Sequence, residues 1–182
     1  MFKIAQQLKK KNIAEYIVYM WQVEDLIRAN KLDIEQVKKT LILPVTTSQE
    51  EVETEVNWFN ELIDMMRLEG VKEKGHLQIN RIEILKLMDL HQQLIASSHF
   101  PFYSAAYYKA LPFIVELRSK NREENHSELE TCFEALYGVM LLRIKGQEVS
   151  QSTTNAIEVI AAFISMLANY HEKDLAGELK LD

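Results

Sequence analysis

The chain has 182 residues, 47% of them hydrophobic and 26% charged, and carries a formal net charge of −6 at pH 7. The length suffices for one domain with a sizeable core, and the composition is that of an ordinary soluble globular protein. No basic excess is available to bind a phosphate backbone, which argues against nucleic acid as a main partner. We interpret the only basic run, Lys9, Lys10 and Lys11, as a solvated turn; a nucleic-acid or membrane contact is the alternative.

Cys132 is the only cysteine, which excludes an internal disulfide and a cysteine-based metal cluster. A single thiol fits a reducing compartment. Residues 1–11 lack the apolar core of a signal peptide, and the longest clearly apolar block, residues 159–164, is far too short to span a bilayer. We therefore expect a cytoplasmic protein that does not act at a membrane.

Hydrophobic spacing predicts a short amphipathic helix at 2–10 and then the strongest helix pattern in the chain, at 12–29. Asn12 and Glu15 have the spacing of a capping box, in which each side chain bonds the backbone N–H of the other residue. Glu24 lies near the middle of the apolar face of this helix, and Arg28 follows one turn later.

An unpartnered buried carboxylate is costly, so we expect Arg28 to neutralise Glu24. Glu followed by Arg at i, i+4 is the favourable order for an ion pair on a helix. The simpler interpretation is a structural ion pair at the edge of the core. The alternative is a carboxylate that binds a ligand or takes part in catalysis.

Capping residues and breakers mark out the remaining helices. A shorter helix is expected between Asp33 and Pro44. Longer helices are expected at 48–69, 76–97, 102–120, 125–145 and 152–171, with a frayed helical tail at 172–182. No convincing strand, repeat or domain boundary interrupts them. The sequence therefore predicts an all-α fold, a single-domain bundle of about six main helices over residues 1–182 with short connectors.

Three details of these helices are specific enough to test. Ser48 with Glu51, and Asn125 with Glu128, have capping-box spacing. Pro112 is expected to kink the helix that contains it. The helix at 48–69 also carries apolar residues with coiled-coil spacing: Val52, Val56, Phe59, Ile63 and Met66.

The sequence contains no motif that identifies a reaction. Phosphate-binding glycine loops and a nucleophile elbow are absent. His171-Glu172 begins like a zinc-protease motif, but Leu175 stands where the second histidine is needed. Two Glu-x-x-His spacings, Glu73 with His76 and Glu123 with His126, fall in polar connectors, and we interpret both as coincidence. We therefore predict no catalytic residue, no metal and no cofactor.

Several polar side chains nevertheless fall on the apolar faces of two predicted helices. They are Glu24, Arg28, Asn80, Glu83 and His91. If these helices pack together, the polar groups would line one cavity, with Tyr103 and Tyr107 in its wall, and these seven residues are our candidate ligand-binding set. A carboxylate beside a histidine can serve acid–base chemistry. The alternative is that these groups satisfy one another or bridge a subunit interface, and that the tyrosines belong to the core.

The segments NIAEYIVYMWQVEDLIRA, LHQQL and FYSAAYYKALPFIVEL together resemble a family of small helical proteins from Bacteroides-like bacteria, described only as a domain of unknown function. The resemblance covers nearly the whole chain. It implies an all-helical bacterial protein, and it implies no reaction, cofactor or partner.

Two functional hypotheses follow. The first is a non-enzymatic helical protein that binds another protein or a second copy of itself. The second is a small-ligand-binding protein or enzyme that uses Glu24, Arg28, Glu83 and His91. A closed cavity lined by Glu24, Arg28 and His91 would favour the second hypothesis, and full mutual hydrogen bonding without a cavity would favour the first.

Overall fold

A computed structural model of the chain describes residues 1–120 and 126–180. All regular structure in these residues is helical, which confirms the all-α class. The helices are α1 (Phe2–Lys11), α2 (Ile13–Ala29), α3 (Ile34–Val37), a π-helical turn (Lys38–Ile42), α4 (Gln49–Leu68), α5 (Gln78–Ala96), α6 (Pro101–Lys120), α7 (Glu128–Ile144) and α8 (Gln151–Leu175). The six expected main helices correspond to α2 and α4 to α8, and the short α1 and α3 raise the number of described α-helices to eight.

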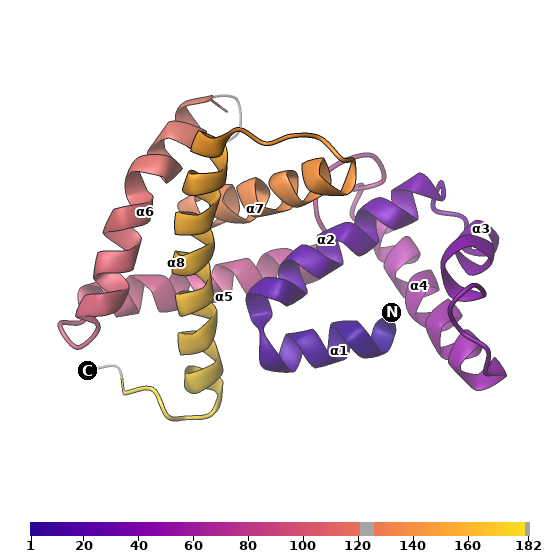
Figure 1. Cartoon of the computed structure of the whole chain (residues 1–182). Coiled ribbons are helices and arrows are strands. Elements are labelled where there is room, and N and C mark those ends of the chain that lie inside the picture. Colours follow the sequence, from indigo (N-terminus) through magenta and orange to yellow (C-terminus); the bar gives the residue numbers. More distant parts are fainter. Residues whose placement is uncertain (121–125, 181–182) are drawn as a thin grey trace.

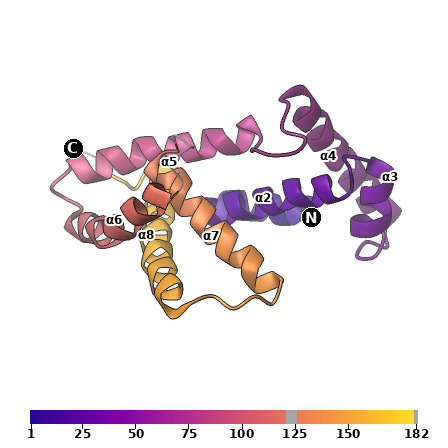
Figure 2. The same ribbon diagram turned by 90° about the horizontal axis from the view of Figure 1, so that it is seen from above.

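Helix α2 occupies the middle of the fold and packs against α1, α4, α5, α7 and α8. Helices α3 and α4 lie at one end of the molecule, and α6 and α8 lie at the other (Figures 1 and 2). In Figure 1 α8 crosses α5 steeply, so the helices are not all aligned along one axis. Within the described ranges, no helix is both long enough and apolar enough to cross a membrane.

The central position of α2 follows from its sequence. Its buried residues are Ile13, Tyr16, Ile17, Met20, Trp21, Val23, Glu24 and Ile27. A helix that is apolar over so much of its circumference needs neighbours on several sides. Glu24 is one of the eight, and it is fully shielded from solvent.

Asn12 separates α1 from α2. Its backbone N–H donates to the Leu8 carbonyl at 2.8 Å and completes the last turn of α1. Its side-chain oxygen accepts from the backbone N–H groups of Ala14 and Glu15 at 3.1 and 3.2 Å and begins α2. The predicted capping box is therefore only half formed. The Asn12 side-chain amide donates to the Glu15 carboxylate at 2.8 Å instead. The Asn12 backbone N–H that a capping box would require is already bonded to the last turn of α1.

The other predicted helix ends differ in detail. Gly70 has a φ of 72° just past α4, and the Val71 N–H bonds the Met66 carbonyl at 3.0 Å, as expected of a glycine stop. The Ser48 side chain makes no cap bond. Glu51 pairs instead with Lys3 of α1.

At the start of α7, Ser127 and Glu130 form a complete capping box. The predicted partner of Glu128, Asn125, lies outside the described residues, as does Glu123. Helix α6 continues through Pro112, which lies inside it without ending it.

Candidate functional site

Glu24 is the most completely hydrogen-bonded of the sequence candidates. One carboxylate oxygen, Oε1, accepts from the Leu77 backbone N–H at 3.0 Å and from the Asn80 side-chain amide at 2.7 Å. The other, Oε2, lies 2.7 Å from His76 Nδ1. The expected partner Arg28 makes only a long contact of 3.9 Å with Oε2. The burial of Glu24 is therefore compensated mainly by residues at the start of α5 rather than by its helical neighbour.

Arg28 holds the connector that joins α4 to α5. Its guanidinium donates to the Val71 carbonyl at 3.1 Å and to the Gly75 carbonyl, and it also pairs with Asp25 at 2.7 Å. Arg28 thus bonds the connector at Val71 and Gly75, and Glu24 bonds it at His76 and Leu77. Together they fix the path by which the chain enters α5.

His76 is the residue that sequence reasoning missed. Its Nδ1 hydrogen-bonds Glu24, and in the neutral tautomer that donates from Nδ1 the other ring nitrogen, Nε2, is an acceptor. The imidazole stacks on Trp21 at 3.8 Å between ring centroids and 9° between planes, while 27% of the side chain stays exposed. The available signal was spacing, because His76 and Asn80 are four residues apart and would share a face of the helix predicted at 76–97, although α5 itself begins at Gln78.

Glu83 has different partners. Although it is buried, the ammonium groups of Lys9 and Lys86 each approach within 3.1 Å of it. Burial favours the neutral carboxyl, but the hydrogen bonds from Lys9 and Lys86 outweigh burial and lower the pKa of Glu83. Lys9 also lies over the Tyr16 ring at 5.3 Å, so it helps attach α1 to the core instead of standing free in a solvated turn.

His91 belongs to an aromatic cluster formed by α5, α6 and α8. Its Nδ1 is 2.6 Å from the Tyr103 hydroxyl, and the rings of Tyr107 and Phe163 lie 4.8 and 5.7 Å from the imidazole. Burial lowers the pKa of His91, against the opposing charge of Glu128. The surroundings of the imidazole therefore favour its neutral form.

The seven sequence candidates thus fall into three groups rather than lining one cavity. Asn80 and Arg28 accompany Glu24, Glu83 has its own lysines, and the two tyrosines accompany His91. His91 follows Asn80 by eleven positions on one helix, which corresponds to roughly 16 Å along its axis. In the described part of the chain, Trp21 Nε1 and Asn80 Oδ1 are the buried side-chain polar atoms without a hydrogen-bond partner.

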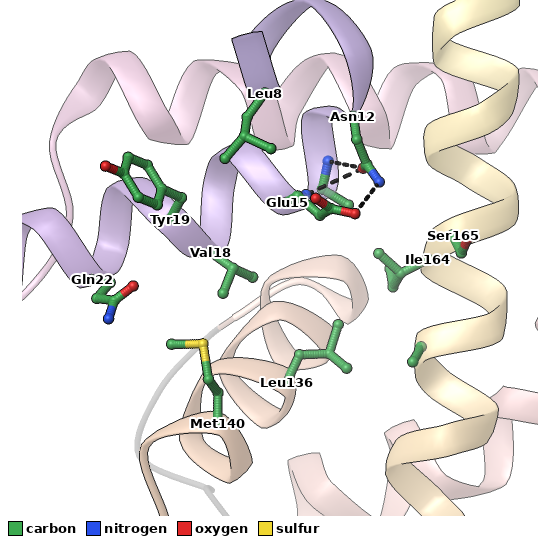
Figure 3. A pocket seen from close by; sticks show the side chains of 12 residues that line it. Leu8, Asn12, Glu15, Val18, Tyr19, Gln22, Leu136, Met140, Ile164 and Ser165 are labelled. Carbon is green, nitrogen blue, oxygen red and sulfur yellow. Dashed lines mark hydrogen bonds between the residues drawn. The ribbon is translucent and has the colours of Figure 1, made fainter. Parts of the chain in front are cut away.

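An apolar groove of about 500 Å³ lies between α1, α2, α7 and α8. Its apolar lining includes Leu8, Val18, Leu136, Met140 and Ile164, and its polar lining consists of Asn12, Glu15, Tyr19, Gln22 and Ser165. Figure 3 shows Leu8 and Val18 facing Leu136 and Met140 across the groove, with Ile164 at the α8 side. Leu8 reaches the groove because the chain reverses direction at Asn12 and α1 folds back beside α2 (Figure 1).

The family model described as domain of unknown function DUF4924 matches residues 1–178. The chain belongs to this family. No curated protein and no solved structure matches it. Membership confirms the resemblance to a family described only as a domain of unknown function, and it assigns the protein no activity.

In the described residues, neither the thiol nor the side chains of metal-binding type form a reactive site. Cys132 is fully buried, and burial raises the pKa of its thiol to about 12, so it stays protonated and unreactive near neutral pH. Among residues 1–120 and 126–180, no three His, Cys, Asp or Glu side chains are grouped so that they could hold a metal ion. The groove and the surroundings of His76 are two of the pockets that the described residues form.

Proposed function

We propose that the protein acts by binding another protein, and that the groove between α1, α2, α7 and α8 receives an amphipathic helix of that partner. The observation that carries the proposal is the lining of the groove, which combines apolar side chains from four helices with the polar side chains of α2 and α8. Helix-in-groove recognition uses this arrangement, because apolar side chains at i, i+3 and i+4 enter the groove while the rest of the partner helix stays in water.

The charge of the groove and of the whole chain indicates which kind of partner helix would bind. Glu15 is the only charged residue in the groove lining, and the whole chain carries a net charge of −6. A helix with Lys or Arg beside its apolar face would therefore be steered toward the groove and would pair with Glu15 in its lining. We infer a basic amphipathic helix as the occupant.

Self-association has less support than the sequence suggested. Phe59, Ile63 and Met66, three residues of the apolar row on α4, are fully buried, and α4 packs against α1, α2 and α3 of the same chain. That row is therefore occupied within the chain. We also propose that the chain forms one domain and comes from Bacteroides-like bacteria, as its sequence indicates. We propose a cytoplasmic location because a lone buried thiol fits a reducing compartment.

The proposal can be tested with a displayed library of helical peptides selected against the protein. Selected peptides should be basic and amphipathic, and Val18→Asp and Met140→Glu should each weaken their binding about tenfold or more in fluorescence anisotropy. Leu175→Glu is the matched control, because Leu175 is exposed near the end of α8, outside the groove lining.

Peptides whose binding ignores Val18 and Met140 would refute the groove as the docking site. Sedimentation of the free protein tests whether a second copy of the chain fills the groove instead. A dimer that dissociates in both groove variants would show that a second copy, rather than a partner helix, fills the groove.

A further inference from the structure

A second pocket, also of about 500 Å³, lies between α2, the 71–77 connector, α5 and α7. It is lined by Trp21, Lys74, Gly75, His76, Arg81, Ile84, His126, Glu130 and Glu134. None of these residues lines the apolar groove. The pocket is rich in ionisable groups, so its ligand must be of a different chemical kind.

His76 lines this pocket with its imidazole held in place. Its Nδ1 hydrogen-bonds Glu24, and the stacked Trp21 ring restrains the imidazole plane. Oε1 of Glu24 is already occupied by Leu77 and Asn80, so the carboxylate is itself held in place. Proteins use a buried carboxylate in this way to orient a histidine so that its other nitrogen can accept a proton or a hydrogen bond.

The charged residues of the pocket come from different elements, and they also act on one another: the charges of His126 and Arg81 help lower the pKa of Glu130. The acidic residues Glu130 and Glu134 both lie on α7, whereas the basic residues Lys74 and Arg81 lie on the connector and on α5. Glu134 pairs with His126, and Glu130 accepts the Ser127 backbone N–H at 2.8 Å. Each carboxylate has lone pairs for further donors, because an ionised carboxyl accepts about four hydrogen bonds.

We propose that this pocket binds a small zwitterion with a primary ammonium and a carboxylate, the chemistry of a free amino acid. The ammonium has three N–H donors for His76 Nε2, Glu130 and Glu134. The carboxylate matches Arg81, whose guanidinium can donate two parallel hydrogen bonds, and Lys74. The inference goes beyond partner binding, because it uses none of the groove residues.

The first experiment is saturation-transfer NMR of the full chain with pooled standard amino acids, followed by calorimetry of each hit. For each hit, the corresponding amine without the carboxylate and the corresponding acid without the ammonium are titrated in parallel. Both analogues should bind about tenfold more weakly or worse, because each lacks one of the two charged groups that the pocket residues would contact. No amino acid binding with a dissociation constant near or below 1 mM would overturn the proposal. An acid that binds as tightly as its amino acid would make the pocket an anion site and would equally overturn it.

Two pocket variants test which side chains contact the bound amino acid. His76→Asn retains a side-chain donor for Glu24 but removes the Nε2 acceptor, and Arg81→Gln removes the guanidinium. Each should weaken amino-acid binding about tenfold or more. Lys39→Gln, in the exposed π-helical turn, and the groove variant Val18→Asp should leave it unchanged. Unchanged affinity in both pocket variants would refute the assignment. Because the peptide and amino-acid experiments use different residues, failure of one proposal leaves the other standing.

Discussion

Two regions of this molecule place polar groups on apolar helix faces, and they do so in opposite ways. The cluster around Glu24 keeps a charge in the core and surrounds it with three hydrogen-bond donors from a neighbouring segment. The cluster around His91 keeps a neutral ring and packs it among aromatic rings, with Tyr103 bonding one nitrogen. A buried polar residue can thus be stabilised by complete hydrogen bonding or by loss of charge.

The difference extends to what each cluster does for the fold. The partners of Glu24 come from the start of α5 and the residues before it, so the charge fixes the path of a connector. The partners of His91 lie on α6 and α8, and the contacts are mostly ring against ring. We therefore expect disruption of the charged cluster to cost more stability than disruption of the neutral one.

The largest effect is expected for Glu24→Leu. Removing the carboxylate leaves the Leu77 N–H, the Asn80 amide and His76 Nδ1 without their acceptor, and breaking a buried charged network costs about 3–5 kcal/mol. Urea melts followed by circular dichroism would measure it. Glu24→Gln is the matched control, because its amide oxygen still accepts from Leu77 and Asn80, and the loss should be clearly smaller. Equal losses in the two variants would mean that hydrogen bonding to Glu24 is not what stabilises the connector.

A smaller effect is expected for Tyr103→Phe. The ring packing remains, but His91 Nδ1 loses its hydrogen-bond partner in a buried site, which costs about 1–2 kcal/mol. Tyr108→Phe is the control, since 59% of Tyr108 is exposed and its hydroxyl can bond water. The same urea melts measure both variants. A loss that matches or exceeds that of Glu24→Leu would reverse the ranking of the two clusters.

The smallest effect is expected from pH. The pKa of His91 is lowered in the folded chain, so the unfolded chain binds more protons, and stability falls as pH drops through about 6.5 toward the folded pKa. His91→Gln cannot take up a proton and should show a weaker decline between about pH 7.5 and pH 5.5. Part of the decline should persist, because burial lowers the pKa of His171 as well. Parallel stability curves for the wild type and His91→Gln would exclude His91 as a source of the decline.

The sequence predicts the helices of this fold far better than the contacts between them. The expected helix at 12–29 is found as Ile13–Ala29, because apolar spacing and a capping residue are local properties. The choice of partner for a buried charge is not local. Arg28 was expected to neutralise Glu24, but the connector offered closer donors in His76 and Leu77, which lie more than 50 residues away in the sequence.

The candidate site shows the same limit. Asn80, Glu83 and His91 share one predicted helix, and their faces could be read from the sequence. Which neighbour each face meets depends on packing, and it separates them into groups with different partners. The groove could not be predicted at all, because its walls come from four helices at the two ends of the sequence.

The break at Asn12 has a consequence for other members of the family. A relative with Ala or Leu at this position would lack the side chain that begins α2, and residues 2–29 would favour one continuous rod of roughly 40 Å. Leu8 would then be carried away from Val18, and one wall of the groove would be lost. Asn12 would therefore separate family members that keep the proposed docking surface from members that lack one of its walls.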